Sequence, residues 1–553
     1  MIFIESSWIP FQHRDLTKGR RFLTPVCSPR NVDWSHQRCL HYKEEISVVV
    51  RHQRASSLSI VTKDAEQVQK PLNYIGGRRV DPSASSPEFD LVAPATGEIL
   101  RHVNNSESND VDAAVDTAKG AFAKWSKVTA FERGKILIKA ASIIREHSEV
   151  LARTEVLDTG KPIWEARCDI LGCADTVEYY GGLASSLAGE FTQFQEGSFA
   201  YTIREPVGVI GAVGAWNYPF QMATWKSSPA LACGNTVVFK PSPLTPLTAV
   251  MLGEIYKQAG LPDGCYNVVQ GETVTGQLIC RHSDIAKLSF TGSISTGIKV
   301  MEAAAQGIKY VTLELGGKSP LVIFEDAHMD NAVKGAMLAN FSNQGQVCSN
   351  GTRVFVQRNI LKEFTKRLTE RTRAMVIGDP NNEETTVGAT ISAHQAETVL
   401  RYIEGAKNEG ACVVYGGERV VPSPHLAGGY YLSPCILGDC RDDMTVVREE
   451  VFGSVMSLLC FDTEDEVIIR ANNTKYGLAG GIFTNDLTRA HRMASKLEAG
   501  SLYINNYNVY PVGVPFGGYK MSGIGRENGR DTLNYYTQIK SVFVEMNDIS
   551  CSY

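Results

Sequence analysis

Apolar residues recur at helical spacing in two long segments near the start of the main part of the chain. Asp110 to Trp125 and Gly134 to Val156 both show this pattern, which predicts two helices. The segments 199–204 (FAYTIR) and 541–545 (SVFVE) instead have the composition of β-strands. The second segment lies near the C-terminus, where it could pair with the edge of a partner sheet.

Short apolar runs alternate with helical stretches from Val207 onward. This alternation predicts a parallel α/β sheet with ligand sites at the carboxyl ends of its strands. A second α/β region begins at Ser319, and no internal repeat is visible. The predicted strands are 207–214, 235–241, 266–270, 287–292, 320–324 and 353–357, and the predicted helices of the first region are Met222 to Ala232 and Thr248 to Gln258.

Residues 1–69 differ from the rest because arginines are scattered among apolar and serine residues without sustained periodicity. Two interpretations compete for this leader, a basic targeting extension and a disordered segment. Transit peptides are poor in acidic residues. This leader contains five in its sequence, namely Glu5, Asp15, Asp33, Glu44 and Glu45. Disorder and a cytoplasmic location are therefore favoured, with mitochondrial targeting as the alternative.

Composition narrows the class of protein. A length of 553 residues suggests two or three domains, and 43% hydrophobic residues are enough to bury ordinary cores. The net charge of −5 gives no reason to expect a nucleic acid or an anionic membrane as partner. No apolar run reaches the length of a membrane helix, so a soluble protein is expected. The 13 cysteines lack metal-site or disulfide spacing, which predicts reduced thiols that mostly serve as packing, and no metal.

Several loops that follow predicted strands carry polar residues suited to a ligand. Trp216, Asn217 and Tyr218 follow the strand that ends at Gly214, and Lys240 ends the next strand. A lysine there sits on the ligand side of the sheet, although an ordinary surface lysine explains it equally well. The loop 290–297 (FTGSISTG) places glycine and hydroxyl groups before a helix, as pyrophosphate sites do, but a simple helix cap fits too. No G-x-G-x-x-G fingerprint occurs; the nearest miss, Gly523-Ile-Gly525, has Asn528 in the last position.

Two further residues stand out by their surroundings. Glu314 lies in an apolar strand directly before two glycines, so it is either saturated with hydrogen bonds or held as a base with a raised pKa. Cys348 lies between glycines and polar residues rather than in an apolar run. That setting predicts an exposed loop thiol.

Seven motifs occur along the chain in a fixed order: GAWNYP, FKPS, FTGS, LELGGKSP, GQVCSNG, EEVFG and PFGGYKMSGIGRENG. With these motifs, the chain resembles the aldehyde dehydrogenase superfamily from about Lys70 to the C-terminus. Within this superfamily, the chain is most similar to the branch that oxidises betaine aldehyde and aminobutyraldehyde. This similarity rests on the segments WNYPFQMATWKSSPALACGN, NNYNV and GRENGRDTLNYY. The ordered set is far more specific than any one motif.

The resemblance implies a role for three residues in catalysis. Cys348 would attack the aldehyde carbon as the nucleophile, and the Asn217 amide with the backbone N–H of Cys348 would stabilise the oxyanion. Glu314 would activate the water that hydrolyses the thioester. This chemistry requires no metal.

The resemblance also implies NAD as cofactor. Many NAD-preferring relatives carry a glutamate three residues after the lysine, where this chain has Pro243. The preference for NAD over NADP therefore rests on the similarity of the branch. The implied contacts are Lys240 at the adenine ribose, Gly292, Ser293 and Gly297 near the pyrophosphate, and Trp216, Glu450 and Phe452 around the nicotinamide and its ribose.

Substrate preference follows from the branch. A quaternary ammonium group offers no hydrogen-bond donor, so an aromatic cage is its natural receptor. Tyr218 and Trp225 match positions that line the substrate channel of relatives, although a packing role is the alternative for Trp225. Ser342 stands where many relatives have tryptophan, so the cage is either incomplete or rebuilt by Tyr507 and Tyr510.

The implied reaction is oxidation of 4-trimethylaminobutyraldehyde to γ-butyrobetaine, as in carnitine biosynthesis, and of related aminoaldehydes. Alternatives are a general aliphatic aldehyde or semialdehyde dehydrogenase, and a catalytically silent paralogue. A silent paralogue would have lost Cys348, Glu314 or Asn217, and all three are present.

The resemblance implies an α/β fold with a Rossmann-like NAD-binding domain, an α/β catalytic domain and a small β oligomerisation extension. A homotetramer is expected, with the strands near 199–204 and 541–545 at the subunit contacts. The corresponding ranges are 70–187 and 207–316 for NAD binding, 317–533 for catalysis, and 188–206 with 534–553 for oligomerisation.

Overall fold

The computed structural model describes residues 70–83, 86–549, 551 and 553. The leader, residues 1–69, lies outside this part, so its predicted disorder or targeting role and the predicted cellular location stay predictions. Within the described part, no helix is both long and apolar enough to cross a membrane.

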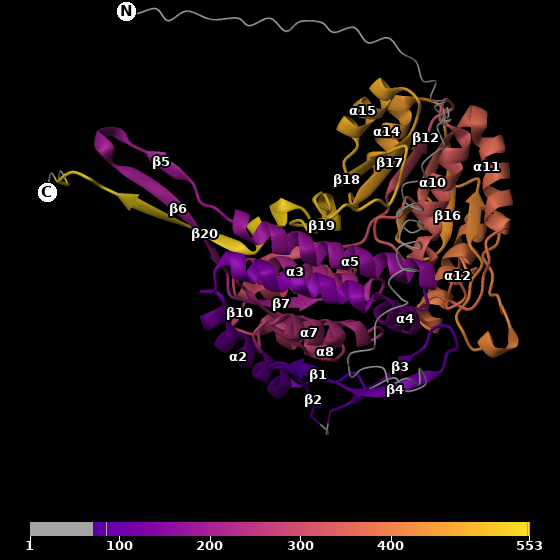
Figure 1. The fold of residues 1–553 in the computed structure, drawn as a ribbon. Helices are drawn as coiled ribbons and strands as arrows, with labels where there is room; N and C mark the ends of the chain where they lie inside the picture. The colour runs from indigo at the N-terminus through magenta and orange to yellow at the C-terminus, as the bar shows by residue number, and fades with distance from the viewer. Residues whose placement is uncertain (1–69, 84–85, 550, 552) are drawn as a thin grey trace, which may run out of the picture. The chain divides into compact units, whose positions relative to one another are not determined.

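An eight-stranded sheet forms the centre of the first α/β region (Figure 1). Its order is β19-β11-β10-β7-β8-β9-β1-β2, and the five strands from β11 to β9 are parallel, as predicted. The edges differ, because β1, β2 and β19 pair antiparallel. The bounds are β1 (Asn73–Ile75), β2 (Arg78–Val80), β7 (Val209–Val213), β8 (Thr236–Lys240), β9 (Tyr266–Val268), β10 (Ile285–Thr291), β11 (Tyr310–Glu314) and β19 (Gly523–Ile524).

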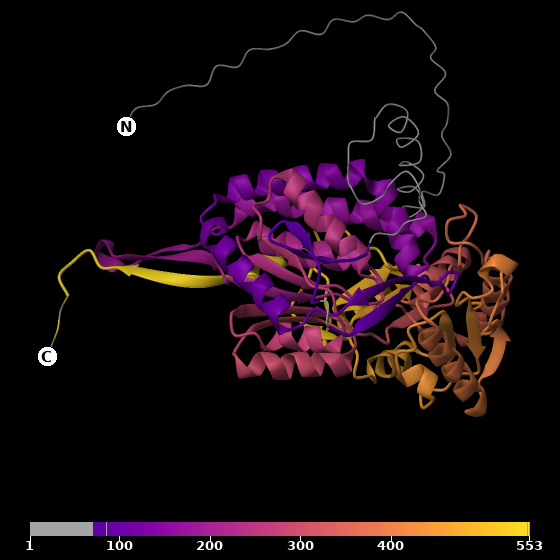
Figure 2. The ribbon, with the colours of Figure 1, turned by 90° about the horizontal axis from the view of Figure 1, so that it is seen from below.

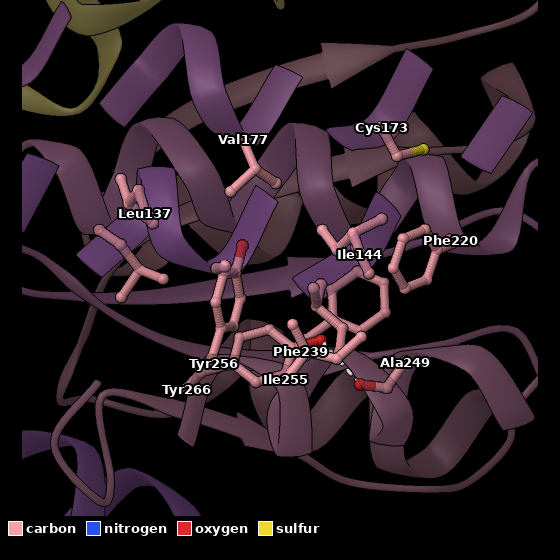
Figure 3. Packing of buried hydrophobic residues seen from close by; sticks show 14 of the residues in the cluster. Leu137, Ile144, Cys173, Val177, Phe220, Phe239, Ala249, Ile255, Tyr256 and Tyr266 are labelled. Atoms are coloured by element: carbon pink, nitrogen blue, oxygen red, sulfur yellow. Dashed lines mark hydrogen bonds between the residues drawn. The ribbon is translucent and has the colours of Figure 1, made fainter. Parts of the chain in front are cut away.

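Helices α2 to α9 accompany this sheet and bury its apolar residues. Figure 3 shows part of the core, where Leu137 and Ile144 of α3, Val177 of α5 and Tyr256 of α7 pack together. Several cysteines pack here and in the second region as buried side chains, as predicted: Cys173, Cys233, Cys265, Cys280, Cys435 and Cys440. The helices are α2 (Ser108–Trp125), α3 (Ala130–Glu146), α4 (Ser148–Thr159), α5 (Ile163–Leu183), α6 (Pro219–Ala232), α7 (Leu247–Ala259), α8 (Thr273–Arg281) and α9 (Ile294–Gln306).

The single helix predicted over 134–156 is wrong, because the chain breaks at His147. This residue has φ −103° and ψ 15°, ending α3 and starting α4. Ile144 before the break and Leu151 after it are both buried. The apolar spacing therefore continues across the break and does not reveal it.

A seven-stranded sheet forms the second α/β region, in the order β14-β15-β16-β13-β12-β17-β18, and only β14 pairs antiparallel. Its strands are β12 (Pro320–Ile323), β13 (Arg353–Gln357), β14 (Cys412–Tyr415), β15 (Cys435–Gly438), β16 (Val455–Phe461), β17 (Ala479–Phe483) and β18 (Ser501–Ile504). Its helices are α10 (Met329–Phe341), α11 (Arg358–Arg373), α12 (Ala393–Asn408), α13 (Thr445–Arg448), α14 (Glu464–Asn472) and α15 (Leu487–Lys496).

A three-stranded antiparallel sheet extends away from the helices of the first region (Figures 1 and 2). It contains β5 (Phe191–Gln193), β6 (Phe199–Pro206) and β20 (Thr537–Val544). The two strands predicted here are confirmed, and they pair with each other along their whole length, from Thr537 opposite Pro206 to Val544 opposite Phe199. A separate two-stranded sheet joins β3 (Glu88–Val92) to β4 (Ile99–Asn104).

The domain boundaries stay a prediction, but one strand departs from them. β19, at Gly523–Ile524, falls within the range assigned to the catalytic domain and pairs with β11 of the first sheet. The near-miss glycine motif is therefore an edge strand, which agrees with its rejection as a dinucleotide loop.

Candidate active site

Cys348 follows a short 3-10 segment, η3 (Ser342–Gly345), in the loop between α10 and β13. It is half-buried and packs against a cluster made of Trp225, Leu478 and Phe516. The predicted exposed loop thiol is therefore wrong. The cover comes from α6 and from the segment around residue 516, which the sequence around Cys348 does not reveal.

The pKa of the Cys348 thiol lies well above its ordinary value. Burial is the largest cause, and the carboxyl groups of Glu450 and Glu314 add to it, while the backbone N–H groups of Cys348 and Ser349 oppose it. Many reactive cysteines have a depressed pKa, so this thiol needs a proton acceptor or a change in its surroundings before it can attack.

Glu314 ends β11 and is 4% exposed. Neither carboxyl oxygen has a hydrogen-bond partner among the described residues. Burial raises its pKa well above the ordinary value and Glu527 raises it further, against the opposing charges of Lys226 and Arg526. Of the two interpretations of the sequence, the structure favours a base with a raised pKa over a carboxylate saturated with hydrogen bonds.

The Asn217 side chain is fixed by the loop that leads to Cys348. Its Nδ2 donates to the Gln346 carbonyl at 2.9 Å, and Asn343 Nδ2 donates to the Asn217 carbonyl at 2.9 Å. One Nδ2 hydrogen engages Gln346, which leaves the second to serve an oxyanion. Asn217 is 4% exposed, so this donor is held in place before any substrate arrives.

The η3 segment is strained and is supported from α5. Asn343 and Gln344 have φ of 46° and 53°, the left-handed region that L-residues seldom adopt. Both oxygens of Glu165 accept from the Asn343 N–H at 3.0 Å. Burial raises the pKa of Glu165 to about 8, with this N–H bond opposing it. Glu165 was not predicted as a site residue, because nothing in the local sequence connects it to a loop 178 residues away.

The loop after β10 has the form expected of a pyrophosphate site. Ser293 caps α9 by accepting from the Thr296 N–H at 3.3 Å, so the positive end of the helix lies at the carboxyl end of β10. Gly297 is buried, and a Cβ there would lie 2.6 Å from Leu315 Cδ2. Gly292 donates its N–H to the Glu314 carbonyl at 3.1 Å. Gly297 therefore allows close helix packing, while Gly292 links this loop to the strand that carries the candidate base.

Lys240 ends β8, as predicted, but it is buried rather than a surface lysine. Its Nζ donates to the Pro241 carbonyl at 2.9 Å and to the Gly271 carbonyl at 2.5 Å. Burial lowers its pKa to about 8, against the raising effect of Glu272. These two carbonyls aim the ammonium group at the carboxyl edge of the sheet.

Glu450 reaches across to the glycines that follow Glu314. Its Oε1 accepts from the Gly317 N–H at 3.2 Å, and a Cβ on Gly316 would lie 1.9 Å from its Oε2. Phe452, at φ 56°, meets Trp216 edge to face with ring centroids 5.2 Å apart. Trp216 therefore lies against Phe452, two residues from Glu450, which brings together aromatic and carboxylate groups of the kind that suit a flat ring and a ribose.

The two predicted channel aromatics have different surroundings. Trp225 packs beside Cys348 and meets Phe516 edge to face at 5.9 Å. The ring of Tyr218 makes a cation–π contact with Lys161, whose Nζ lies 4.2 Å from the ring centroid. Lys161 is fully buried and its Nζ donates to Asp169 at 2.7 Å.

Tyr507 and Tyr510, the two tyrosines considered as replacements in the aromatic cage, differ in burial and in their contacts. Tyr507 is 0% exposed and its hydroxyl donates to the Ser349 carbonyl at 2.9 Å, so it is a core residue and cannot rebuild a cage. Tyr510 is half-buried, contacts Phe516 edge to face at 5.3 Å and joins the cluster around Cys348. Phe516 was not predicted as a site residue, although its position directly before the two glycines of the PFGGYK motif was a usable signal.

The structure thus gathers Trp225 and Glu314 about Cys348 and holds Asn217 in the same loop network, with Glu450, Phe452 and Trp216 adjoining. Lys240, Gly292, Ser293 and Gly297 lie along the carboxyl edge of the first sheet. Their individual roles stay predictions.

Comparison with known proteins gives a consistent result. The model of the aldehyde dehydrogenase family matches residues 81–542. The 4-trimethylaminobutyraldehyde dehydrogenase A of Danio rerio is 56% identical over 483 residues, which cover 87% of this chain and 95% of that protein. The human 4-trimethylaminobutyraldehyde dehydrogenase is 55% identical over 487 residues, covering 88% and 99%.

Solved structures agree. Betaine aldehyde dehydrogenase from Staphylococcus aureus in complex with NAD⁺ is 36% identical, with a TM-score of 0.85 and coverage of 88% of this chain and 97% of that one. The NAD⁺ complex of an aldehyde dehydrogenase from Bacillus cereus is 42% identical, with a TM-score of 0.84 and coverage of 87% and 97%.

Proposed function

This chain belongs to the aldehyde dehydrogenase family, and we propose that it oxidises 4-trimethylaminobutyraldehyde to γ-butyrobetaine. The family performs NAD-dependent oxidation of aldehydes to carboxylic acids, and NAD is the cofactor of this chain. The substrate proposal goes further, to a trimethylammonium aldehyde and related aminoaldehydes.

The proposed chemistry begins at Cys348. The Cys348 thiol first gives its proton to water, and the thiolate then attacks the aldehyde carbon. The resulting oxyanion accepts hydrogen bonds from Asn217 Nδ2 and the Cys348 N–H. Bound NAD would supply the hydride acceptor, and loss of a hydride from the thiohemiacetal carbon would give a thioester on the Cys348 sulfur. Glu314 then takes a proton from water, which hydrolyses the thioester and releases the acid.

The residues that would hold NAD fit its chemistry. The capped N-terminus of α9 at Ser293 offers a positive helix end to the pyrophosphate. Lys240 offers a fixed ammonium group to a ribose hydroxyl, and Glu450 offers carboxyl oxygens to the second ribose. Phe452 and Trp216 provide the aromatic wall for the nicotinamide.

One observation carries the substrate proposal, namely the aromatic cluster that surrounds the nucleophile. Trp225, Phe516 and Tyr510 are linked by edge-to-face contacts of 5.9 and 5.3 Å, and Cys348 packs against the cluster that contains Trp225 and Phe516. Ring faces attract a cation that has no hydrogen-bond donors, so a trimethylammonium group suits such a wall better than a carboxylate tail does.

A panel of aldehydes tests the substrate proposal. We expect kcat/KM to be highest for 4-trimethylaminobutyraldehyde, followed by 4-aminobutyraldehyde and betaine aldehyde, with hexanal below them, when NAD is saturating. NADP in place of NAD should lower each value. If hexanal or succinic semialdehyde has the highest kcat/KM, the substrate proposal is overturned in favour of a general aliphatic or semialdehyde dehydrogenase.

We propose a homotetramer whose contacts include the three-stranded sheet. Ile539 and Phe543 on β20, with Phe191 and Tyr201 on the neighbouring strands, expose apolar side chains, and the outer edge of β20 is unpaired within the described residues. Light scattering of the paired variant Ile539→Lys with Phe543→Lys should show a smaller assembly than wild type. Val421→Lys, at an exposed apolar residue elsewhere, should not change the mass.

A further inference from the structure

A small pocket lies on the second α/β region and contains two buried cations. It is lined by residues 318–320 before and in β12, Arg353 of β13, residues 471, 472, 474 and 476–479 around the end of α14, and 497–499 after α15, and its volume of about 10 Å³ has room for one water-sized sphere. We call it the Lys318 pocket. Lys318 is 1% exposed and Arg353 is 3% exposed.

Lys318 differs from other buried lysines of this protein. Lys161 Nζ donates to Asp169 at 2.7 Å, Lys226 Nζ pairs with Glu527 at 2.6 Å and Lys287 Nζ donates to Thr312 at 2.5 Å. Within the described residues, Nζ of Lys318 has no hydrogen bond and no ion pair. An ammonium group with little contact with water and no partner is costly, so it loses its proton, contacts water in the pocket or acquires a compensating anion there.

Arg353 adds a second positive charge that is also without an acidic partner in the described part of the chain. Its guanidinium donates to three carbonyls, those of Lys318 at 2.8 Å, Arg470 at 3.1 Å and Ala471 at 2.7 Å. These bonds fix the group without neutralising it, because a carbonyl carries no net charge. Its remaining N–H hydrogens are available to an acceptor in the pocket.

The carboxyl groups nearby are already engaged. Glu498 lines the pocket, but its Oε2 pairs with Lys520 at 2.5 Å. Glu450 accepts from the Gly317 N–H, and it raises the pKa of Lys318 together with Cys440 and Glu449. Burial and the charge of Arg353 outweigh these effects and lower the pKa of Lys318 to about 7. Tyr476, the other titratable group of the lining, is neutral near pH 7 because burial raises its pKa to about 12.

We propose that the Lys318 pocket binds one small monovalent anion of the size of chloride, held by Lys318 Nζ and Arg353. The pocket is too small for a tetrahedral dianion such as phosphate. Leu478 lines this pocket and also belongs to the cluster that packs against Cys348, so the anion site adjoins the active-site cluster. It lies behind Glu450, where Gly317 and Lys318 connect it to the predicted nicotinamide ribose contact.

Anion binding must be linked to protonation of Lys318. The anion binds the ammonium form, so it should stabilise the protein more at pH 6.5 than at pH 9. A general salt effect on surface charges does not distinguish chloride from a bulky anion at the same ionic strength. Chloride against gluconate at constant ionic strength therefore separates the two causes.

Thermal unfolding of the full-length protein in 150 mM sodium chloride or sodium gluconate is the first test. We expect chloride to raise Tm over gluconate by about 2 °C or more at pH 6.5 and by much less at pH 9. Lys318→Met should abolish the chloride preference, and Lys139→Met, at an exposed lysine, should retain it. No chloride preference in the wild type at either pH would overturn the proposal.

Crystals grown or soaked in sodium bromide give the second test, which holds even if Lys318→Met fails to fold. Anomalous density within hydrogen-bond distance of Lys318 Nζ in the wild type would support the site. Absence of that density, or equal density in Lys318→Met, would overturn it. Phosphate in place of bromide should give no density there.

Discussion

Lys161 Nζ lies 4.2 Å from the centre of the Tyr218 ring, so an internal cation occupies a face of a residue predicted to bind a cationic substrate. The two roles are compatible only if substrate uses the rest of the ring. Lys161 is held from its other side by Asp169 at 2.7 Å and by Glu155 at 3.6 Å. The Tyr218 ring therefore belongs both to a buried charge network and to the candidate channel.

Tyr218→Leu separates these roles. Loss of the ring should lower Tm, because Lys161 loses a cation–π contact worth about 1–2 kcal/mol when desolvated. If the ring also binds substrate, KM for 4-trimethylaminobutyraldehyde should rise roughly 5- to 30-fold, whereas KM for hexanal changes little. Tyr218→Phe keeps the ring and should preserve both properties. Equal changes in KM for the two aldehydes would assign Tyr218 to structure alone.

Cys348→Ala should abolish NADH formation, since no other group can form the thioester. Binding of NAD, followed by quenching of tryptophan fluorescence, should survive. Cys412→Ala removes an exposed thiol on β14 and should leave turnover unchanged. Measurable dehydrogenase turnover by Cys348→Ala would contradict the assignment of the nucleophile.

Glu314→Gln should give a burst of about one NADH per active site followed by slow turnover, because acyl-enzyme formation precedes the step that needs the base. In the wild type, the steady-state rate should increase with pH as the buried carboxyl group ionises, since its pKa is raised. The pH dependence should disappear from the slow phase of the variant. A variant that shows no burst would indicate that Glu314 acts earlier, for instance on the Cys348 thiol, whose own pKa is raised.

Glu165→Gln should change how stability depends on pH. Burial raises the pKa of Glu165 to about 8, so the folded protein holds a proton that the unfolded chain releases above about pH 4.5. The protonated Glu165 therefore contributes fully to stability below about pH 4.5. This contribution is lost as the pH rises towards 8, and the free energy of unfolding falls by no more than about 1.4 kcal/mol per pH unit. Glutamine still accepts from the Asn343 N–H but does not ionise.

The measurement for Glu165 is Tm between pH 5 and 8.5. The variant should fall less steeply than the wild type, and Glu178→Gln, at an exposed carboxylate of the same helix, should follow the wild type. Parallel curves for Glu165→Gln and wild type would show that the carboxyl group does not carry this proton.

Much of the first sheet was predictable because its strands are short, apolar and separated by amphipathic helices. Lys240 was placed correctly at the end of β8, and Ser293 at the head of α9. The break at His147 was not predictable, since the buried positions of α3 and α4 keep one helical phase. Backbone conformation at a single residue leaves no trace in a hydrophobic pattern.

The chemistry of the site was less predictable than its position. The polar residues around Cys348 suggested exposure, but Trp225 and Phe516, each more than 120 positions away along the chain, cover the thiol. The contact of Lys161 with Tyr218 and the support of Asn343 by Glu165 have the same origin. Each depends on how helices α4 and α5 pack against loops, and spacing along the chain does not encode that.

The position of β19 in the first sheet affects the order in which this sheet can be completed during synthesis. Residues 73–314 supply seven of its strands, whereas Gly523–Ile524 completes the edge beside β11, and β20 must still reach β6. During synthesis, β11 therefore stays uncovered on this edge until Gly523 and Ile524 have been made, more than 200 residues later. Glu314, at the end of β11, acquires its closed environment only after that point.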